Sequence, residues 1–339
     1  MLSVGILGAG TWGIALARML DLCGRQVTVW SALEEEIRRL SRTRRHPKLP
    51  GMEIPPGVCF TSEIARACRE KDIIVFAVPS LYVRATAAKA AEYIQPGQVI
   101  VDVAKGMEAE TLMTLTEVIG DEINKEIPLV ALSGPTHAEE VAMDLPTTIV
   151  SACEDIKIAE FVQEVFTGPF MRVYTNTDKK GVEISGALKN IIALAAGLSK
   201  GLGYGDNTKA AIITRGIAEI SRLGQAMGCQ NRTFSGLAGI GDLVVTCTSE
   251  HSRNHQAGVL LGQGYSARQA VEKVGMVVEG IHMLPAAMRL SQTYAVELPI
   301  ACGVNDIVNH GLEPRLAVNV LMDRKLKNEH ESDCLHTVV

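Results

Sequence analysis

The segment Gly8-Ala9-Gly10-Thr11-Trp12-Gly13 constrains the fold of this chain more than any other. It is a G-x-G-x-x-G pattern that directly follows an apolar run, residues 4–7, and precedes a helix-like stretch, residues 14–23. In such a strand-turn-helix unit the first glycine makes a tight turn, the second lets the backbone approach a pyrophosphate, and the third lets the helix pack on the strand. The helix N-terminus then offers free N–H groups to the phosphates. We therefore expect Gly8, Gly10 and Gly13 to hold a dinucleotide; the alternative is a glycine turn that serves packing only.

Short, β-branched apolar runs alternate with helix-like segments through about residue 175. Near-continuous apolar strands separated by helices indicate a mostly parallel, doubly wound sheet with helices on both faces. The expected strands are residues 4–7, 27–30, 73–78, 99–103, 129–132, 147–151 and 171–174. Ligands bind at the carboxyl ends of such strands. Turn residues follow four of these ends, at 8–10, 78–80, 104–106 and 133–136.

The pattern changes to helical spacing after Asp178, as in Ile184, Leu188 and Ile191. A length of 339 residues also exceeds what one hydrophobic core usually organises. The predicted fold class is therefore α/β, an N-terminal doubly wound Rossmann-type sheet followed by an all-helical C-terminal domain. The predicted limits are 1–178 for a dinucleotide-binding domain, 179–325 for a helical substrate-binding and catalytic domain, and 326–339 for a polar, flexible tail.

Composition excludes several classes of protein. The net charge of -5 argues against a nucleic-acid binder, although it leaves room for a small anionic ligand held by a few cations. The 8 cysteines form no CxxC pair, as is typical of reduced thiols in a cytosolic protein. No unbroken apolar run reaches the roughly 18 residues of a membrane span. We expect a soluble, cytoplasmic protein with no stable membrane insertion.

Ser31 stands at the end of the second expected strand, where a residue roughly 20 positions past the glycines contacts the adenosine ribose. There is no Asp at this position to bind a 2'-hydroxyl. No Arg immediately follows to receive a 2'-phosphate, since Arg38 and Arg39 lie a helical turn or more downstream. The Ser31 hydroxyl can donate to either form of ribose, so both NAD and NADP remain open, with NAD slightly favoured.

Lys189 lies in a helical stretch of small and apolar residues, 183–197, where an ammonium group needs a partner or a function. The alternative is a surface lysine whose stem packs on apolar neighbours while its charge reaches water. Asn190 beside it and Ser185 one turn earlier favour a functional group. Lys105, after the fourth of the listed strands, is the other cation expected at the cleft.

A second polar group follows the glycine-rich segment 236–241. Asp242 and Thr246 are four residues apart and share one face of a helix. Ser252, Arg253 and Asn254 then offer hydroxyl, guanidinium and amide donors in succession, which suits a phosphate. The alternative is a capped helix followed by a solvated loop.

Cys247, His251 and His255 also follow one another at a spacing of four. On one continuous helix they could form a metal-binding face. Loop-forming residues intervene and no further ligand is evident, so we expect no metal site.

Together these motifs resemble the NAD(P)-dependent glycerol-3-phosphate dehydrogenase family, in its soluble bacterial form, from Val4 to about Leu321. Several distinctive segments in the right order are more specific than any one of them. The segments that carry the resemblance are residues 8–13, 46–51, 78–80, 104–106, 132–138, 183–197, 236–246, 252–254 and 278–280.

The resemblance implies a reversible hydride transfer between nicotinamide C4 and the C2 carbon of dihydroxyacetone phosphate or sn-glycerol 3-phosphate. It makes Lys189 the proton donor or acceptor at the C2 oxygen, with Lys105 polarising that oxygen and Asp242 and Thr246 completing the cluster. A lysine ordinarily titrates at about 10.4, so this role needs a lowered pKa. Burial and Lys105 would lower it and Asp242 would raise it, and the sequence leaves that balance open. The resemblance also implies a homodimer and a role in glycerophospholipid synthesis.

The resemblance further assigns binding contacts by motif. Those for the small phosphorylated substrate are Lys105, Gly134, Thr136, Lys189, Asn190, Asp242, Ser252, Arg253 and Asn254. Those for the cofactor are Thr11, Trp12, Lys105, Ala138, Arg253, Val277 and Glu279. One departure concerns the ribose: bacterial members often carry a basic pair after the tryptophan of the second strand, where this chain has Ser31 and Ala32.

Two other functions remain in competition. One is another dehydrogenase of similar build, such as a 2-hydroxyacid or ketopantoate-type reductase, although residues 252–254 with Lys105 and Lys189 favour a phosphorylated substrate. The other is a redox-sensing module that binds the dinucleotide without turnover. A sensor has no need of Lys189, Asp242 and Thr246 together, so their joint presence favours the enzyme.

Overall fold

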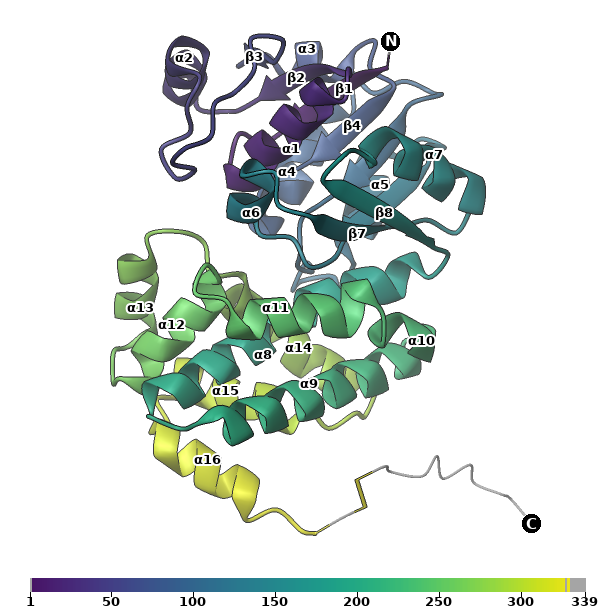
Figure 1. Cartoon of the computed structure of the whole chain (residues 1–339). Helices are drawn as coiled ribbons and strands as arrows, with labels where there is room; N and C mark the ends of the chain where they lie inside the picture. Colours follow the sequence, from purple (N-terminus) through teal and green to yellow (C-terminus); the bar gives the residue numbers. More distant parts are fainter. Residues whose placement is uncertain (1, 327, 330–339) are drawn as a thin grey trace, which may run out of the picture.

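The computed structural model describes residues 2–326, 328 and 329, which form a sheet-containing part and a helical part, one above the other in Figure 1. The strands of the first part are β1 (Ser3–Leu7), β2 (Gln26–Trp30), β3 (Cys59–Thr61), β4 (Ile73–Phe76), β5 (Val99–Asp102), β6 (Leu129–Ser133), β7 (Thr147–Ala152) and β8 (Met171–Asn176). Its helices are α1 (Thr11–Leu22), α2 (Glu34–Thr43), α3 (Ile64–Cys68), η1 (Ser80–Tyr82), α4 (Val83–Ala90), α5 (Leu115–Ile123), α6 (Ala138–Ala142) and α7 (Ile156–Phe166).

All eight strands form one sheet in the order β3-β2-β1-β4-β5-β6-β7-β8. Strands β1 to β6 run parallel, whereas β7 pairs antiparallel with β6 and parallel with β8. The predicted mostly parallel sheet is therefore confirmed, and the turns after β1, β4, β5 and β6 meet at one edge. The sequence analysis missed β3, because a strand of three residues, Cys59–Thr61, is too short to show a strand pattern.

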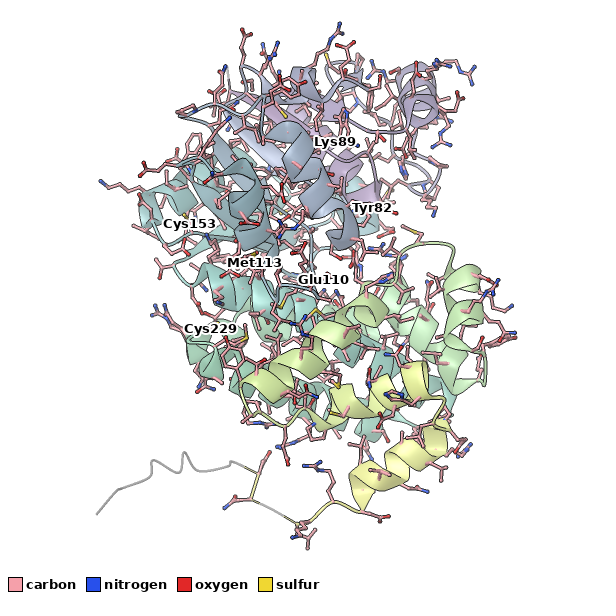
Figure 2. All side chains as sticks on the ribbon, turned by 180° about the vertical axis from the view of Figure 1, so that it is seen from behind. Tyr82, Lys89, Glu110, Met113, Cys153 and Cys229 are labelled. Carbon is pink, nitrogen blue, oxygen red and sulfur yellow. The ribbon has the colours of Figure 1, made fainter. Side chains whose placement is uncertain are left out.

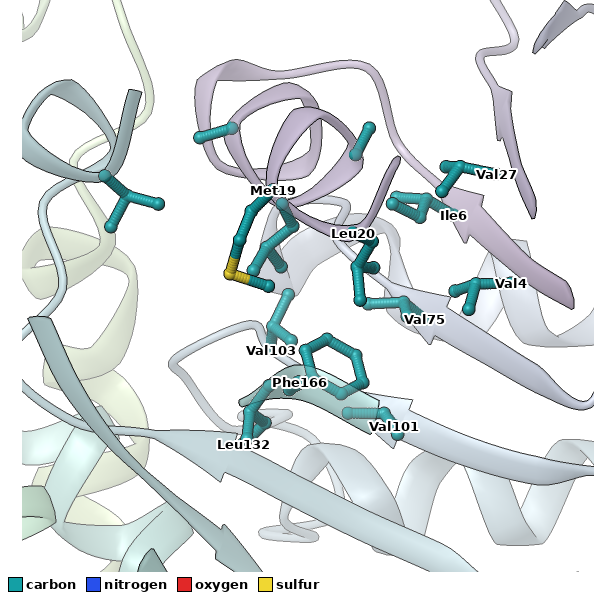
Figure 3. Close-up of a cluster of buried hydrophobic side chains, with 14 of the residues drawn as sticks. Val4, Ile6, Met19, Leu20, Val27, Val75, Val101, Val103, Leu132 and Phe166 are labelled. Atoms are coloured by element: carbon teal, nitrogen blue, oxygen red, sulfur yellow. The ribbon is translucent and has the colours of Figure 1, made fainter. Parts of the chain in front are cut away.

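Successive side chains of a strand point to opposite faces of the sheet, and here the side chains on both faces are buried by helices. Val4 and Ile6 of β1 face the cluster formed with α1, α6 and α7, which Figure 3 shows around Leu20 and Phe166. Leu7 instead belongs to the cluster on the opposite face, with α3, α4 and α5. This two-sided burial is what the near-continuous apolar strands predict.

The second part is helical throughout its described length and is built around one buried helix, α8 (Lys179–Gly201). Around it lie α9 (Asp206–Ala226), α10 (Asn231–Phe234), η2 (Leu237–Gly241), α11 (Asp242–Thr248), α12 (Arg253–Gly262), α13 (Ala267–Val274), α14 (Glu279–Thr293), α15 (Pro299–His310) and α16 (Pro314–Met322). Among the described residues, α8 alone is long and apolar enough to cross a membrane, and its most apolar window is entirely buried within the protein.

Glycines let α8 and α12 pack at close range. A Cβ added to Gly197 of α8 would lie 2.1 Å from His255 O, and one added to Gly258 of α12 would lie 2.2 Å from Leu194 O. These distances exclude any side chain at either position without a shift of the backbone. This close packing brings the N-terminus of α12 beside the middle of α8, where Asn254 contacts Asn190.

The segment between β5 and α5 leaves the sheet part, packs against the helical part and returns. Met107 belongs to the core of the helical part, whereas Leu115 belongs to a core of the sheet part. Arg289 of α14 donates hydrogen bonds to the backbone oxygens of Ala109 and Glu110. Figure 2 shows Glu110 between the two parts. Because Lys105 lies in this segment, its backbone is anchored on both sides.

The predicted limits of the parts, 1–178 and 179–325, remain predictions, although β8 ends at Asn176 and α8 begins at Lys179. Of the predicted tail, residues 327 and 330–339 lie outside the described residues.

Candidate functional site

The glycine turn after β1 has the geometry that a pyrophosphate needs. Gly8 has a φ of +128°, and a Cβ there would lie 2.6 Å from Ala77 O. A Cβ on Gly13 would lie 2.2 Å from Gly8 O, so this glycine lets α1 pack against the turn. A Cβ on Gly10 would meet no atom within 4 Å, which leaves open space at the start of α1. The turn fits the phosphates of a dinucleotide, as the motif predicts.

Lys189 is the centre of a buried polar cluster. Its side chain is only 6% exposed, and its Nζ donates to Asp242 Oδ1 at 2.5 Å and to Thr246 Oγ1 at 2.6 Å. Asp242 also accepts a hydrogen bond from Lys105 Nζ at 2.7 Å, and Lys105 donates a second one to Gly134 O at 2.9 Å. The alternative of a surface lysine at position 189 is therefore wrong. The structure brings together all four residues predicted to be catalytic.

Asp242 and Thr246 reach this cluster because the chain bends just before α11. Gly239, in η2, has φ -94° and ψ -106°, and a Cβ there would lie 2.1 Å from Phe234 O. Helix α11 then begins at Asp242. Thr246 Oγ1 donates to Asp242 O at 2.6 Å, which confirms that these two residues share one helix face.

Electrostatics in the cluster favour a lysine that exchanges its proton near neutral pH. Burial lowers the pKa of Lys189 to about 7; Lys105 adds to this effect and Asp242 opposes it. Burial would raise the pKa of Asp242, but Lys105 and Lys189 outweigh that effect and hold it below its usual value. The balance that sequence left open thus favours a lowered lysine pKa beside a charged carboxylate.

The predicted phosphate-binding residues stand at the N-terminus of α12. Ser252 Oγ caps this helix by accepting from His255 N at 3.2 Å. Arg253 Nη1 donates to Val277 O at 3.2 Å, so two predicted cofactor contacts touch each other. The alternative of a capped helix followed by a solvated loop is wrong for this segment. Helix α11 has no side-chain cap, Ser252 and Asn254 are buried, and Arg253 begins α12.

The two predicted asparagines contact each other. Asn254 Nδ2 donates to Asn190 Oδ1 at 2.9 Å, and Asn254 Oδ1 accepts from Gly280 N at 2.8 Å. Both polar atoms of the Asn254 side chain are thus engaged within the protein. The pair ties α8, α12 and α14 together behind Lys189.

The other predicted contacts lie along the junction of the two parts. Glu279, at the start of α14, accepts from both the backbone N and the Oγ of Ser80, the first residue of η1. Thr136 Oγ1 donates to Gly134 O at 3.1 Å, and Ala138 is the buried first residue of α6. Trp12 packs against a core of the sheet part.

Two family models match the chain, one for the N-terminus of NAD-dependent glycerol-3-phosphate dehydrogenase over residues 3–159 and one for its C-terminus over residues 178–319. The chain belongs to the NAD-dependent glycerol-3-phosphate dehydrogenase family. The resemblance that the motifs carry is therefore confirmed.

Individual relatives agree with this family. The chain is 60% identical to a glycerol-3-phosphate dehydrogenase [NAD(P)+] of Lactobacillus delbrueckii subsp. bulgaricus, over 97% of this chain and 99% of the relative. The crystal structure of a glycerol-3-phosphate dehydrogenase from Coxiella burnetii superposes with a TM-score of 0.91 at 34% identity, covering 95% of this chain and 99% of that one. A ketopantoate reductase from Ralstonia eutropha JMP134, at 15% identity and a TM-score of 0.60, shares the fold alone, over 95% of this chain and all of that one.

In this member of the glycerol-3-phosphate dehydrogenase family, sequence reasoning missed two polar residues, the buried Asp102 and the half-buried His137. Asp102, at the end of β5, accepts from Ala104 N at 3.2 Å, and burial followed by the nearby Glu183 raises its pKa well above the usual range. Burial, and then the nearby Lys189, lower the pKa of His137. A carboxylate at the end of an apolar strand was the signal for Asp102; nothing in the sequence distinguished His137.

Cys247, His251 and His255 do not form the metal-binding face that their spacing would allow on one helix. Cys247 lies in α11, which ends at Thr248, and His255 lies in α12, which begins at Arg253. His251 falls in the break between the two helices. The three side chains therefore do not share one helical face.

Proposed function

We propose that this chain catalyses reversible hydride transfer between NAD(P)H and dihydroxyacetone phosphate, with sn-glycerol 3-phosphate as the product. The observation that carries this proposal is the buried Lys189, paired with Asp242 and Thr246 and accompanied by Lys105. A redox sensor has no need for a buried lysine whose pKa is about 7. The name of the family and those of its relatives support the same substrate.

The residues at the glycine turn fit the dinucleotide. Gly8, Gly10 and Gly13, with the first N–H groups of α1, would hold its pyrophosphate, while Val277 and Glu279 stand at the opposite side of the junction. When bound, the reduced dinucleotide supplies the hydride for the substrate carbonyl.

Lys189 manages the proton. Reduction of the C2 carbonyl leaves an alkoxide oxygen, which needs cationic stabilisation and then a proton. Protonated Lys189 donates that proton to the C2 oxygen, and neutral Lys189 accepts it back when the alcohol is oxidised. The Lys105 side chain would polarise the same oxygen. Asp242 holds both ammonium groups in place, at 2.7 Å from Lys105 and 2.5 Å from Lys189.

Arg253 and Ser252 are the proposed ligands of the substrate phosphate. A guanidinium can bind phosphate oxygens through two parallel hydrogen bonds, and the N-terminus of α12 adds a favourable dipole. The pair of Asn190 and Asn254 holds that helix end against α8. Gly134, whose backbone oxygen accepts from both Thr136 and Lys105, would line the other end of the substrate together with Thr136.

The wider setting is part of the same proposal. We propose a cytoplasmic homodimer that takes a small phosphorylated substrate and supplies glycerol 3-phosphate to glycerophospholipid synthesis. A mild acidic net charge of -5 is compatible with this substrate because the site gathers Lys105, Lys189 and Arg253.

Replacement of the proposed acid tests the function. In Lys189→Met, oxidation of NADH or NADPH by dihydroxyacetone phosphate should slow by about 10³-fold, the usual contribution of a general acid, while dinucleotide binding persists. Lys200→Met is the matched control, because Lys200 lies on the same helix but is half exposed and pairs with Glu250 at 3.4 Å. Near-normal turnover in Lys189→Met would reject the assignment. If the wild type oxidises neither NADH nor NADPH in the presence of dihydroxyacetone phosphate, the redox-sensing module is favoured instead.

A further inference from the structure

A hydrogen-bonded pair, Ser31 and Glu36, stands at the end of β2 beside the glycine turn. Trp30, the last residue of β2, accepts a hydrogen bond from Gly8 N at 2.9 Å, so Ser31 follows directly at the edge where the turn begins. In dinucleotide-binding folds this strand end meets the adenosine ribose. An acidic group there accepts from the 2'-hydroxyl of NAD, whereas a nearby Arg accommodates the 2'-phosphate of NADP.

The hydroxyl of Ser31 is used within the protein. Its Oγ donates to Glu36 Oε2 at 2.7 Å and accepts from Leu33 N at 3.2 Å, and the residue is 6% exposed. A serine hydroxyl has a single hydrogen to donate. In this arrangement Ser31 therefore has no hydrogen left for either form of ribose, contrary to the role that sequence suggested for it.

Glu36 is thus the acidic group held at the ribose position. It lies in the first turn of α2, five residues after Ser31, and is partly exposed. Ser31 binds one carboxylate oxygen, and no hydrogen bond from the described residues reaches the other, Oε1. That oxygen can accept a hydrogen bond from a 2'-hydroxyl. The carboxylate of Glu36, which comes from α2 and accepts from the Ser31 hydroxyl, takes the place of an Asp on the strand itself.

The cations of α2, Arg38, Arg39 and Arg42, follow its acidic first turn. Residues 31–37 contain no Lys or Arg. Arg38 pairs with Glu34 at 2.6 Å and with Glu35 at 3.8 Å, on the exposed side of the helix. Arg39 lies close enough to His46 to add to the burial that lowers the pKa of that imidazole to about 4. A 2'-phosphate here would meet three glutamates in the first turn of α2.

We propose that this chain selects NADH over NADPH and that Glu36, positioned by Ser31, decides the selection. The 2'-hydroxyl of NADH gains a charge-assisted hydrogen bond to the carboxylate. The 2'-phosphate of NADPH loses that bond and is repelled by a like charge. The inference rests on the proposed function, because it requires that the glycine turn binds a dinucleotide.

Equilibrium binding tests the inference without turnover. Dissociation constants for NADH and NADPH are measured by nucleotide fluorescence on the full chain, in the wild type, Glu36→Gln and Glu35→Gln. Both substitutions remove one charge from the same helix turn, but Glu35 makes no contact with Ser31 and serves as the matched control. The wild type should bind NADH about 10- to 100-fold more tightly than NADPH, as expected for one lost ionic hydrogen bond with added repulsion. Glu36→Gln should shrink that ratio about tenfold, and Glu35→Gln should leave it within about twofold.

The outcomes separate this inference from the proposed function. Equal affinities in the wild type, a preference for NADPH, or equal shifts in both variants would overturn the role of Glu36 while leaving a dinucleotide enzyme. Binding of neither NADH nor NADPH would instead overturn the proposed function. Competition by AMP and by adenosine 2',5'-bisphosphate gives a second readout at the ribose itself. AMP should compete with NADH more strongly, and equal competition would also overturn the inference.

Discussion

The glycine turn after β1 and the lysine cluster around Lys189 are built from different materials. The turn consists of backbone from six successive residues, and its glycines matter because side chains would collide or fill its space. The cluster consists of side chains from three distant segments, with Asp242 between Lys105 and Lys189. Backbone geometry is encoded locally, whereas the pKa of a buried lysine depends on everything packed around it. Changes at the two places should therefore fail in different ways.

Removal of the carboxylate should have the largest effect. Asp242→Asn leaves two lysines beside a neutral amide, so the ammonium groups repel each other and lose their common anchor. We expect kcat to fall by about 10³-fold, comparable to loss of a preorganised electrostatic group. The measurement is steady-state turnover, accompanied by the dissociation constant of NADH, which should change little. Loss of NADH affinity equal to the loss of turnover would contradict the separation of the two regions.

Adding a side chain at the glycine turn should instead weaken NADH binding and leave the lysine cluster intact. Gly10→Val adds atoms to open space, and its φ of -69° and ψ of 177° suit valine, so the fold should tolerate it. The affinity for NADH should fall by about 10- to 100-fold, because the added side chain blocks the approach of the backbone to the pyrophosphate. Dinucleotide titration measures the loss, and thermal unfolding checks that stability is unchanged. Unaltered affinity would show that the turn serves packing only.

A change of pH should have the smallest of these effects, and it should act on the lysine cluster but not on the glycine turn. The pKa of Lys189 is about 7, so its acid form falls by half near neutrality and by about tenfold for each further pH unit. Carbonyl reduction needs the acid form, so its kcat/KM should decline above about pH 7, whereas alcohol oxidation should rise over the same range. NADH binding at the glycine turn should stay level from pH 7 to 8.5. A reduction rate that is constant to pH 9 would contradict the assigned proton donor.

Much of the sheet could be predicted because its signals are local. Apolar runs such as those containing Val4 and Ile74 need burial on both sides, and the glycine turn follows from steric limits within six residues. β3 escaped because a three-residue strand is specified mainly by its partner β2. The reversal of β7 relative to β6 also escaped, because chain direction depends on how β7 and β8 pair.

The candidate site divides along the same line. The sequence by itself determined the glycine turn, the residue types of the cluster and the shared helix face of Asp242 and Thr246. Only the tertiary structure decided that Lys189 is buried, that burial outweighs Asp242 in setting its pKa, and that Ser31 donates to Glu36. Helix periodicity and backbone sterics act between neighbours in the chain. Desolvation and ion pairing act between residues that meet only after the helices and the sheet have packed.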